Sequence, residues 1–269
     1  MDMQEKFRQL DEYYAKGDLK GAEDSLTAWV EEAEEAGNMG ALLALYNELE
    51  GLYRTTKRAD QAVEMSGLAL ELIGMMGLNN SVHHATTLLN GATANLVLGN
   101  TDRALTMYQS ALEIFQLQGQ GESYQMAALY NNISHCYQQK GEYDQALEYL
   151  RKALELVSRF DNAQGDVATT RTAIGMCLMS MNRLDEAEAY ILESLGYYEG
   201  DDGLRDGHYS SALSAAGELY WRRRDNAKAL DFFRKALAFN QAYFGDTHSN
   251  TIIRNNIAKI QAESEAVDG

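Results

Sequence analysis

Six alanines recur along the chain at an almost constant interval. Successive members of the set are separated by 40, 42, 42, 41 and 42 residues. They are Ala22, Ala62, Ala104, Ala146, Ala187 and Ala229. A self-similar period of this length predicts an array of equivalent structural units, in which each unit packs only against its neighbours.

The fourth unit shows the pattern most clearly. Its first segment, Met126 to Gln139, carries apolar or small residues at spacings of three and four, which predicts a helix with one buried stripe. Gly141 supplies the left-handed backbone that ends this helix, and a second helix follows. Ala146 and Ala153 lie on the inner side of the second helix, where small side chains let two antiparallel helices approach closely.

The same pattern fits six units, and a lone amphipathic helix follows the last one. Because no linker or change of composition divides the chain, we predict a single domain over residues 1–269. Its fold class is an all-α superhelix of 13 helices, with about six helix pairs and a C-terminal capping helix. The predicted repeats are residues 3–37, 41–78, 84–120, 126–160, 167–200 and 209–244, and the capping helix is 249–264.

Composition narrows the possible partners. The net charge of −17 disfavours nucleic acid, whose binding needs lysine and arginine, and it disfavours an anionic membrane surface. A neutral to basic polypeptide is the expected partner. Proline is absent, whereas an average usage of about 5% would give roughly a dozen. The chain therefore ends its helices with glycine.

Nothing in the sequence predicts export or membrane insertion. No apolar stretch is long enough to span a bilayer, and the start, Met-Asp-Met-Gln-Glu-Lys, lacks a signal-peptide pattern. The two cysteines, Cys136 and Cys177, have no metal or redox spacing and are expected to be small core residues. These features favour a cytoplasmic location.

The register of the fourth unit resembles the tetratricopeptide repeat (TPR) signature. The matching residues are Tyr130, Ser134, Tyr137, Gly141, Ala146, Leu150 and Ala153. The ordinary TPR has 34 residues, and the longer repeat of about 42 is similar to kinesin light chain repeats and related bacterial proteins.

Two details support this long subtype, and two departures count against it. The loop from Phe244 to His248 resembles the subtype's Leu-Gly-x-x-His-Pro loop, and paired asparagines open the first helices at 131–132 and 255–256. The repeat-ending proline of the family is missing, and Glu50 occupies a position where a small residue is usual.

The resemblance implies that the first helix of each pair lines a concave groove that holds a peptide. The groove residues implied in the first half of the chain are Asn47, Gly51, Arg54, Leu89, Asn90, Thr93, Leu96, Asn131, Asn132, His135 and Gln138. Those implied in the second half are Thr172, Met176, Met179, Ser214, Glu218, Trp221 and Arg222.

Asparagines at the matching register are candidates for a peptide-binding ladder. A side-chain amide can both donate to and accept from a peptide backbone. Asn90, Asn132 and Asn256 occupy this register, and Ala173 and Ala215 interrupt it. The alternative interpretation is that the asparagines brace neighbouring helices.

Two further features allow two interpretations each. Met176, Met179 and Trp221 would make part of the groove apolar and adaptable, but methionines at helical spacing also form ordinary core. The basic cluster at 222–224 could receive a peptide carboxylate or could be a solvated helix end.

No catalytic or metal motif is recognisable. His84, His208 and His248 recur just before first helices, which spreads them along the array and favours loop capping over metal binding. The acidic run at 31–35 predicts a solvated helix face. No phosphate loop, nucleophile elbow or dinucleotide fingerprint occurs, so we predict no enzyme activity, no cofactor and no metal.

The sequence therefore predicts a non-catalytic adaptor that binds a protein or peptide in its groove. One alternative is a peptide-switched regulator, but related sensors carry an added amino-terminal bundle, and repeats that begin almost at Met3 leave no room for one. The other alternative is a self-assembling scaffold, that is, a homo-oligomer.

Overall fold

The structure, a computed structural model, describes residues 2–200, 203 and 206–268. Within these ranges it contains 13 α-helices and no β-strand, which confirms the all-α prediction. The helices are α1 (Met3–Lys16), α2 (Leu19–Glu35), α3 (Met39–Thr55), α4 (Ala59–Met75), α5 (Val82–Val97), α6 (Thr101–Leu117), α7 (Tyr124–Gln139), α8 (Tyr143–Val157), α9 (Gln164–Ser180), α10 (Leu184–Tyr198), α11 (Tyr209–Arg222), α12 (Asn226–Tyr243) and α13 (His248–Asp268).

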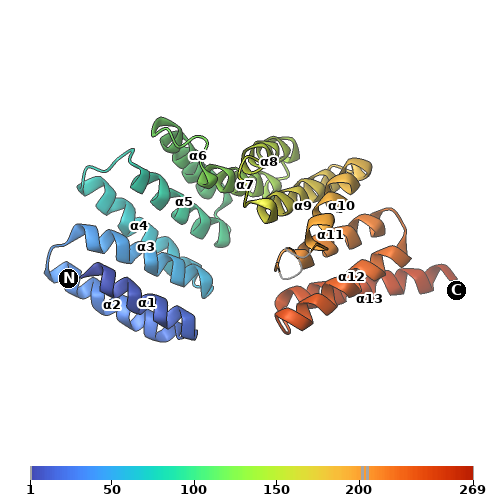
Figure 1. Cartoon of the computed structure of the whole chain (residues 1–269), viewed down its shortest axis with the longest axis horizontal. Helices are drawn as coiled ribbons and strands as arrows, with labels where there is room; N and C mark the ends of the chain where they lie inside the picture. Colours follow the sequence, from blue (N-terminus) through green and yellow to red (C-terminus); the bar gives the residue numbers. More distant parts are fainter. Residues whose placement is uncertain (1, 201–202, 204–205, 269) are drawn as a thin grey trace. The chain divides into compact units, whose positions relative to one another are not determined.

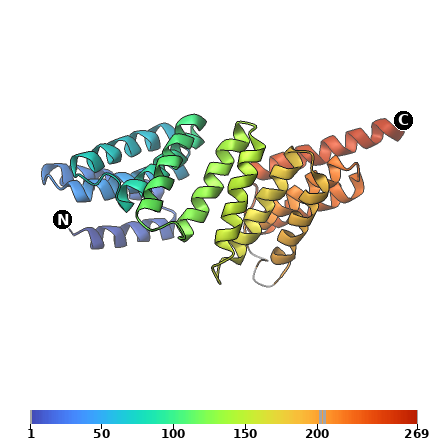
Figure 2. The same cartoon turned by 90° about the horizontal axis from the view of Figure 1, so that it is seen from above.

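The helices divide into two compact units. Unit 1 comprises Met1–Lys140 and holds α1 to α7, and unit 2 comprises Gly141–Gly269 and holds α8 to α13. Within each unit, successive helices pack against one another in chain order (Figures 1 and 2). The single domain over residues 1–269 stays a prediction.

Local sequence explains where the helices begin and turn. Side chains cap several helix starts by accepting hydrogen bonds from first-turn N–H groups, as Ser81 does for α5 and Ser123 for α7. After the first helix of each predicted pair, the backbone turns through a left-handed residue. These residues are Gly17, Lys57, Gly99, Gly141, Asn182 and Arg224. Three of the six turns therefore form without glycine, although glycine adopts this conformation at the lowest cost.

The periodic alanines lie where the sequence places them. All six have no exposed surface, and each lies on the second helix of its predicted pair. Two glycines of first helices show how close the helices come within a pair. A Cβ added to Gly217 would lie 2.9 Å from the ring of Phe233, and one added to Gly175 would lie 2.5 Å from Ile191. Small residues are therefore required at these contacts.

The second predicted repeat reverses this distribution of volume. Glu50 occupies the register of Gly175 and Gly217, and Ser66 occupies the register of Ile191 and Phe233. Glu50 is 1% exposed and Ser66 is 3% exposed, and α3 packs against α4 as other helices pack within their pairs. A large residue on the first helix is compensated by a small one on the second, which keeps the total volume similar.

Candidate peptide-binding face

The first helices of neighbouring pairs lie against one another inside each unit. In unit 1, α5 contacts both α3 and α7, and in unit 2, α9 contacts α11. The second helices, such as α4 and α6, make at most marginal contacts with each other. Within each unit the first helices therefore lie on the inner side of the stack. This is the placement that the predicted binding residues require.

We call the side chains that α3, α5 and α7 contribute in unit 1 the unit 1 face. All of its predicted members retain some exposed surface, and His135 is the most open. The members are Asn47, Arg54, Leu89, Asn90, Thr93, Asn131, Asn132, His135 and Gln138.

The asparagines of the unit 1 face differ in how they are held. Asn47 donates from Nδ2 to the carbonyl of Leu43 at 2.8 Å, so its amide is occupied within its own helix. The side-chain amides of Asn90 and Asn132 are half-buried and make no hydrogen bond to any described residue. Bracing of a neighbouring helix would require such bonds. The ladder interpretation of these two residues stays a prediction.

Two other members of the unit 1 face are tied into the protein. The Thr93 hydroxyl lies 3.0 Å from the carbonyl of Leu89 and 2.9 Å from the hydroxyl of Tyr108. His135 lies 3.4 Å from the amide of Gln139 through its Nε2. These contacts orient the two side chains and leave part of each exposed.

Unit 1 contains a buried acid, Glu50, which in the sequence was only a departure from the repeat pattern. Glu50 lies under Arg54, with 3.5 Å between Glu50 Oε1 and Arg54 Nε. Neither atom has a hydrogen-bond partner. Burial raises the pKa of Glu50 to about 7, and the nearby guanidinium opposes this rise. The signal for this pair in the sequence was a charged residue at a register where the tetratricopeptide repeat usually has a small one.

A second acidic group lies between α1 and α3. Burial, and then the charge of Asp11, raises the pKa of Glu48. Burial also raises the pKa of Tyr14, and both acids add to this effect. Neither acid was among the predicted site residues. Their proximity makes this end of the first-helix surface negative, which suits a cationic group of a partner.

We call the side chains that α9 and α11 contribute in unit 2 the unit 2 face. Met176 is 48% exposed and is therefore an open apolar contact. Ser214 and Glu218 are half-buried. Trp221 donates from its indole N–H to Glu263 at 2.8 Å, and Lys259 lies over its ring at 4.7 Å. The predicted capping helix α13 thus contacts this face.

Two predicted contact residues in unit 2 are instead buried. Thr172 is 6% exposed, and its hydroxyl lies 2.7 Å from the hydroxyl of Ser194 and donates to the carbonyl of Ala168. Ser194 occupies the register of Ala153, so its hydroxyl supplies a buried hydrogen-bond partner for Thr172. Met179 is 3% exposed, which agrees with the core interpretation of this methionine. We leave both out of the unit 2 face.

The basic cluster at 222–224 is largely neutralised by the protein itself. Arg222 donates to Glu218 and to the carbonyl of Met179, both at 2.7 Å. Arg223 donates to Asp185 at 2.6 Å and to Glu188 at 2.8 Å. Of the two predicted roles, the structure therefore does not favour a peptide carboxylate site here.

Other sequence features have structural roles. Cys136 and Cys177 are fully buried, and burial raises the pKa of each thiol to about 11, so neither is an activated nucleophile. His84 accepts a hydrogen bond from the N–H of Asn80, which is a loop-capping contact. The described part of the chain has no group of three or more metal-ligating side chains. None of the helices in the described ranges combines the length and apolarity needed to cross a membrane.

Comparison with known proteins identifies the family. The tetratricopeptide repeat model matches residues 83–159, 125–200 and 165–242, which together span more than half of the chain. The chain belongs to the tetratricopeptide repeat family. No curated protein sequence matches it.

Solved structures share the fold at low sequence identity. The apo form of RapI is 15% identical, with a TM-score of 0.67 and complete coverage of both chains. NprR in complex with its cognate peptide NprX is 16% identical, with a TM-score of 0.65, covering 96% of this chain and 77% of NprR. BtubC (BKLC) from P. vanneervenii is 19% identical, with a TM-score of 0.62, covering 77% of this chain and 84% of BtubC.

Proposed function

We propose that this protein is a non-catalytic scaffold that binds an extended segment of another protein along its first helices. The observation that carries the proposal is the pair of unoccupied amides of Asn90 and Asn132 on the adjacent helices α5 and α7. A side-chain amide can satisfy both the N–H and the C=O of a peptide backbone, whatever the peptide sequence. Asn131 and Gln138 on α7 would contribute further polar contacts.

The partner is proposed to be neutral to basic overall. The chain has a net charge of −17, and Asp11 and Glu48 place two acids near one end of the unit 1 face. Complementary charge accelerates association and rejects acidic competitors. Met176 on the unit 2 face would add an adaptable apolar contact.

The structural neighbours support this kind of function without assigning it. NprR is a tetratricopeptide-fold neighbour whose structure holds a cognate peptide. For the present chain we propose no enzyme activity, cofactor or metal, and a cytoplasmic location. The buried thiols, with pKa values raised to about 11, support the absence of cysteine chemistry.

The test uses peptides selected from a random display library against the full chain. Changing Asn90 and Asn132 together to alanine is expected to weaken the selected peptides by roughly tenfold or more, because two bidentate backbone contacts are lost. The control changes Gln116 and Gln145 to alanine, which are exposed amides on the second helices α6 and α8. Unchanged peptide affinity in the asparagine variant, with an unchanged circular dichroism spectrum, would overturn the proposed face.

A peptide-switched sensor is a second candidate. The apo form of the quorum sensor NprR from B. thuringiensis shares the fold over 96% of this chain, with 16% identity and a TM-score of 0.67. A sensor should change its radius of gyration in small-angle scattering when a selected peptide is added, whereas a passive scaffold should not. Self-assembly is a third candidate, and a strictly monomeric mass at high concentration would remove it.

A further inference from the structure

The Glu50–Arg54 pair of α3 is poorly satisfied as an ion pair. The Glu50 side chain is 2% exposed and the Arg54 side chain is 38% exposed, so the acid lies beneath the base. Their closest atoms are 3.5 Å apart, and both atoms lack a hydrogen bond. Strong charge-assisted hydrogen bonds measure about 2.7–2.9 Å. This pair therefore forgoes most of the stabilisation that a buried carboxylate needs.

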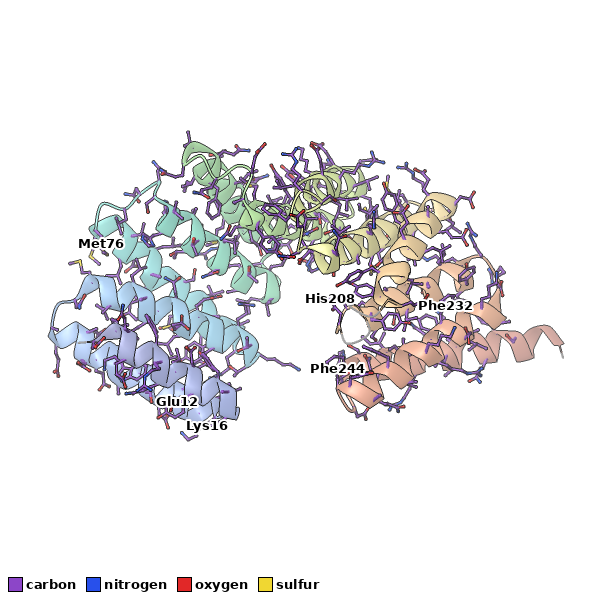
Figure 3. All side chains as sticks on the ribbon, in the orientation of Figure 1. Glu12, Lys16, Met76, His208, Phe232 and Phe244 are labelled. Carbon is purple, nitrogen blue, oxygen red and sulfur yellow. The ribbon has the colours of Figure 1, made fainter. Side chains whose placement is uncertain are left out.

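Arg54 also lacks other partners. No described residue accepts a hydrogen bond from its guanidinium. Arg58, near the start of the next helix, shows the contrast, because it holds Glu23 through two bonds of 2.7 and 2.8 Å. The pair of Glu12 and Lys16 on α1 (Figure 3) is also loose, but both of its side chains are exposed to solvent, unlike that of Glu50. Arg54 combines an exposed guanidinium with a buried and weakly bound counter-ion.

Arg54 is the one described cation that acts on the pKa of Glu50. The hydroxyls of Thr93 and Tyr108 lie 2.9 Å apart, from α5 and α6. Burial raises the pKa of Tyr108 to about 12, and the charges of Glu50, Arg54 and Cys136 also act on it. The ionisable groups near Glu50 are therefore Arg54 on α3, Tyr108 on α6 and Cys136 on α7.

The described ionisable side chains of the other helices packed against α3 are exposed or bonded to other residues. On α2, Glu23 is held by Arg58, and Glu34 accepts a hydrogen bond from the hydroxyl of Tyr46. The remaining ionisable side chains of α4 and α5 are exposed or lie in a first turn, and they are Asp60, Glu64, Glu71, His83 and His84.

We propose that Arg54 is a carboxylate-binding subsite of the unit 1 face, and that Glu50 is its exchangeable counter-ion. The carboxylate of a bound peptide pairs with the guanidinium in place of Glu50, and the Glu50 carboxylate takes up one proton from solvent. The inference rests on the proposed function, because it names a group on the peptide and a control of its binding. The ligand is an otherwise neutral to basic peptide that carries one carboxylate.

The exchange follows from electrostatics. A single guanidinium cannot fully compensate two carboxylates, and the buried one bears the larger desolvation cost. Protonation of Glu50 removes this conflict, and its pKa of about 7 places the proton uptake near neutral pH. By linkage, a ligand that raises this pKa further must bind more tightly as the pH falls.

The experiment uses the full chain and three short N-acetylated alanine peptides that each contain two lysines, so that the probes are basic overall. One has a free C-terminal carboxylate, one is the C-terminal amide, and one is an amide containing a single glutamate. The readout is the Arg54 Nε–H signal in NMR during titration to millimolar peptide, together with proton uptake in calorimetry. Binding of either carboxylate peptide should shift this signal and become roughly tenfold tighter from about pH 8 to about pH 6. The two carboxylate peptides distinguish a terminal from a side-chain carboxylate.

The matched variants test each part of the exchange. E50Q should bind the carboxylate peptides with no pH dependence and no proton uptake, and R54Q should lose the preference for acid over amide. R103Q, at an exposed position on the second helix α6, is the control and should change neither. If R54Q fails to fold, the double variant E50Q/R54Q replaces it, since it removes both charges together.

Three results would overturn the proposal. They are an unshifted Arg54 signal at millimolar peptide, equal binding of the amide, and a pH dependence that persists in E50Q. Equal binding of acid and amide, combined with weaker binding in the Asn90 and Asn132 variant, would remove the Arg54 subsite and leave the proposed function intact. Selected peptides that ignore the asparagine variant would instead remove the proposed function.

Discussion

Two first helices carry a glutamate followed four residues later by an arginine, and the two pairs behave differently. In unit 2, Arg222 Nε lies 2.7 Å from Glu218, whose side chain is 29% exposed. In unit 1, Arg54 Nε lies 3.5 Å from Glu50, whose side chain is 2% exposed. The spacing is identical, so spacing alone does not define an ion pair. What differs is the register of the acid relative to the second helix.

The register difference is a single residue. Glu50 occupies the register of Gly217, and Glu218 is the next residue along α11. One residue rotates a side chain by about 100° around a helix axis, because a turn holds 3.6 residues. Gly217 lies against the ring of Phe233, whereas the corresponding partner register of Glu50 holds Ser66. The smaller serine is what allows a carboxyl group inside unit 1.

A glutamate on α11 at the register that Glu50 occupies on α3 should have the largest effect on stability. In Gly217→Glu, the new Cβ alone would lie 2.9 Å from the ring of Phe233, and the substitution also buries a charge. We expect a loss of about 4 kcal/mol or more in the free energy of unfolding, measured by urea titration. Adding Phe233→Ser should recover part of this loss. Failure of the double variant to recover any stability would contradict the volume exchange seen in the second repeat.

Removing the buried charge from unit 1 should have an intermediate effect that depends on pH. Because burial raises the pKa of Glu50 from 4.5 to about 7, the folded state holds a proton that the unfolded state has lost between these values. The contribution of Glu50 to stability is therefore fully present below the unfolded pKa and is lost as the pH rises through about 7.

The matching measurement compares wild type with Glu50→Gln by urea unfolding at several pH values. Stability relative to the variant should fall by about 3 kcal/mol as the pH rises from about 4.5 to about 8, since one pKa unit corresponds to about 1.4 kcal/mol. The variant should be the more stable protein at the higher pH. A difference that stays constant with pH would show that Glu50 keeps its ordinary pKa.

Removing the exposed acid from unit 2 should have the smallest effect. Glu218→Gln breaks a partly exposed pair, and such pairs contribute about 0–1 kcal/mol. We expect a change within about 0.5 kcal/mol at neutral pH, because Arg222 keeps its bond to the carbonyl of Met179. If Glu218→Gln changed the free energy of unfolding by about as much as Glu50→Gln, register would not explain the difference between the two pairs.

Sequence patterns predicted the parts of the molecule that depend on local spacing. The periodic alanines predicted the close contacts within pairs, and Gly141 predicted the left-handed turn after the first helix of the fourth repeat. The register of the first helices predicted Asn90 and Asn132 as ladder residues, and the half-buried amides of both make no hydrogen bond to a described residue. These features depend on the helix period and on side-chain size, and both can be read directly from the order of residues.

The remaining site properties depended on neighbours from other helices. Thr172 is buried, and its hydroxyl lies 2.7 Å from that of Ser194 on α10. In the basic cluster at 222–224, Arg222 and Arg223 are paired with acids that α11 and α10 supply. Arg54 was predicted as a groove residue, but its poorly bonded and buried counter-ion, Glu50, became visible only in the structure.

The order of residues by itself determined a stack of helix pairs of the tetratricopeptide repeat type, because hydrophobic period, turn residues and alanine spacing are local properties. Only the tertiary structure decided which polar side chains remain available to a partner. Burial and ion pairing are set by whichever side chains meet across helices, and residues that meet in this way lie tens of positions apart in the chain.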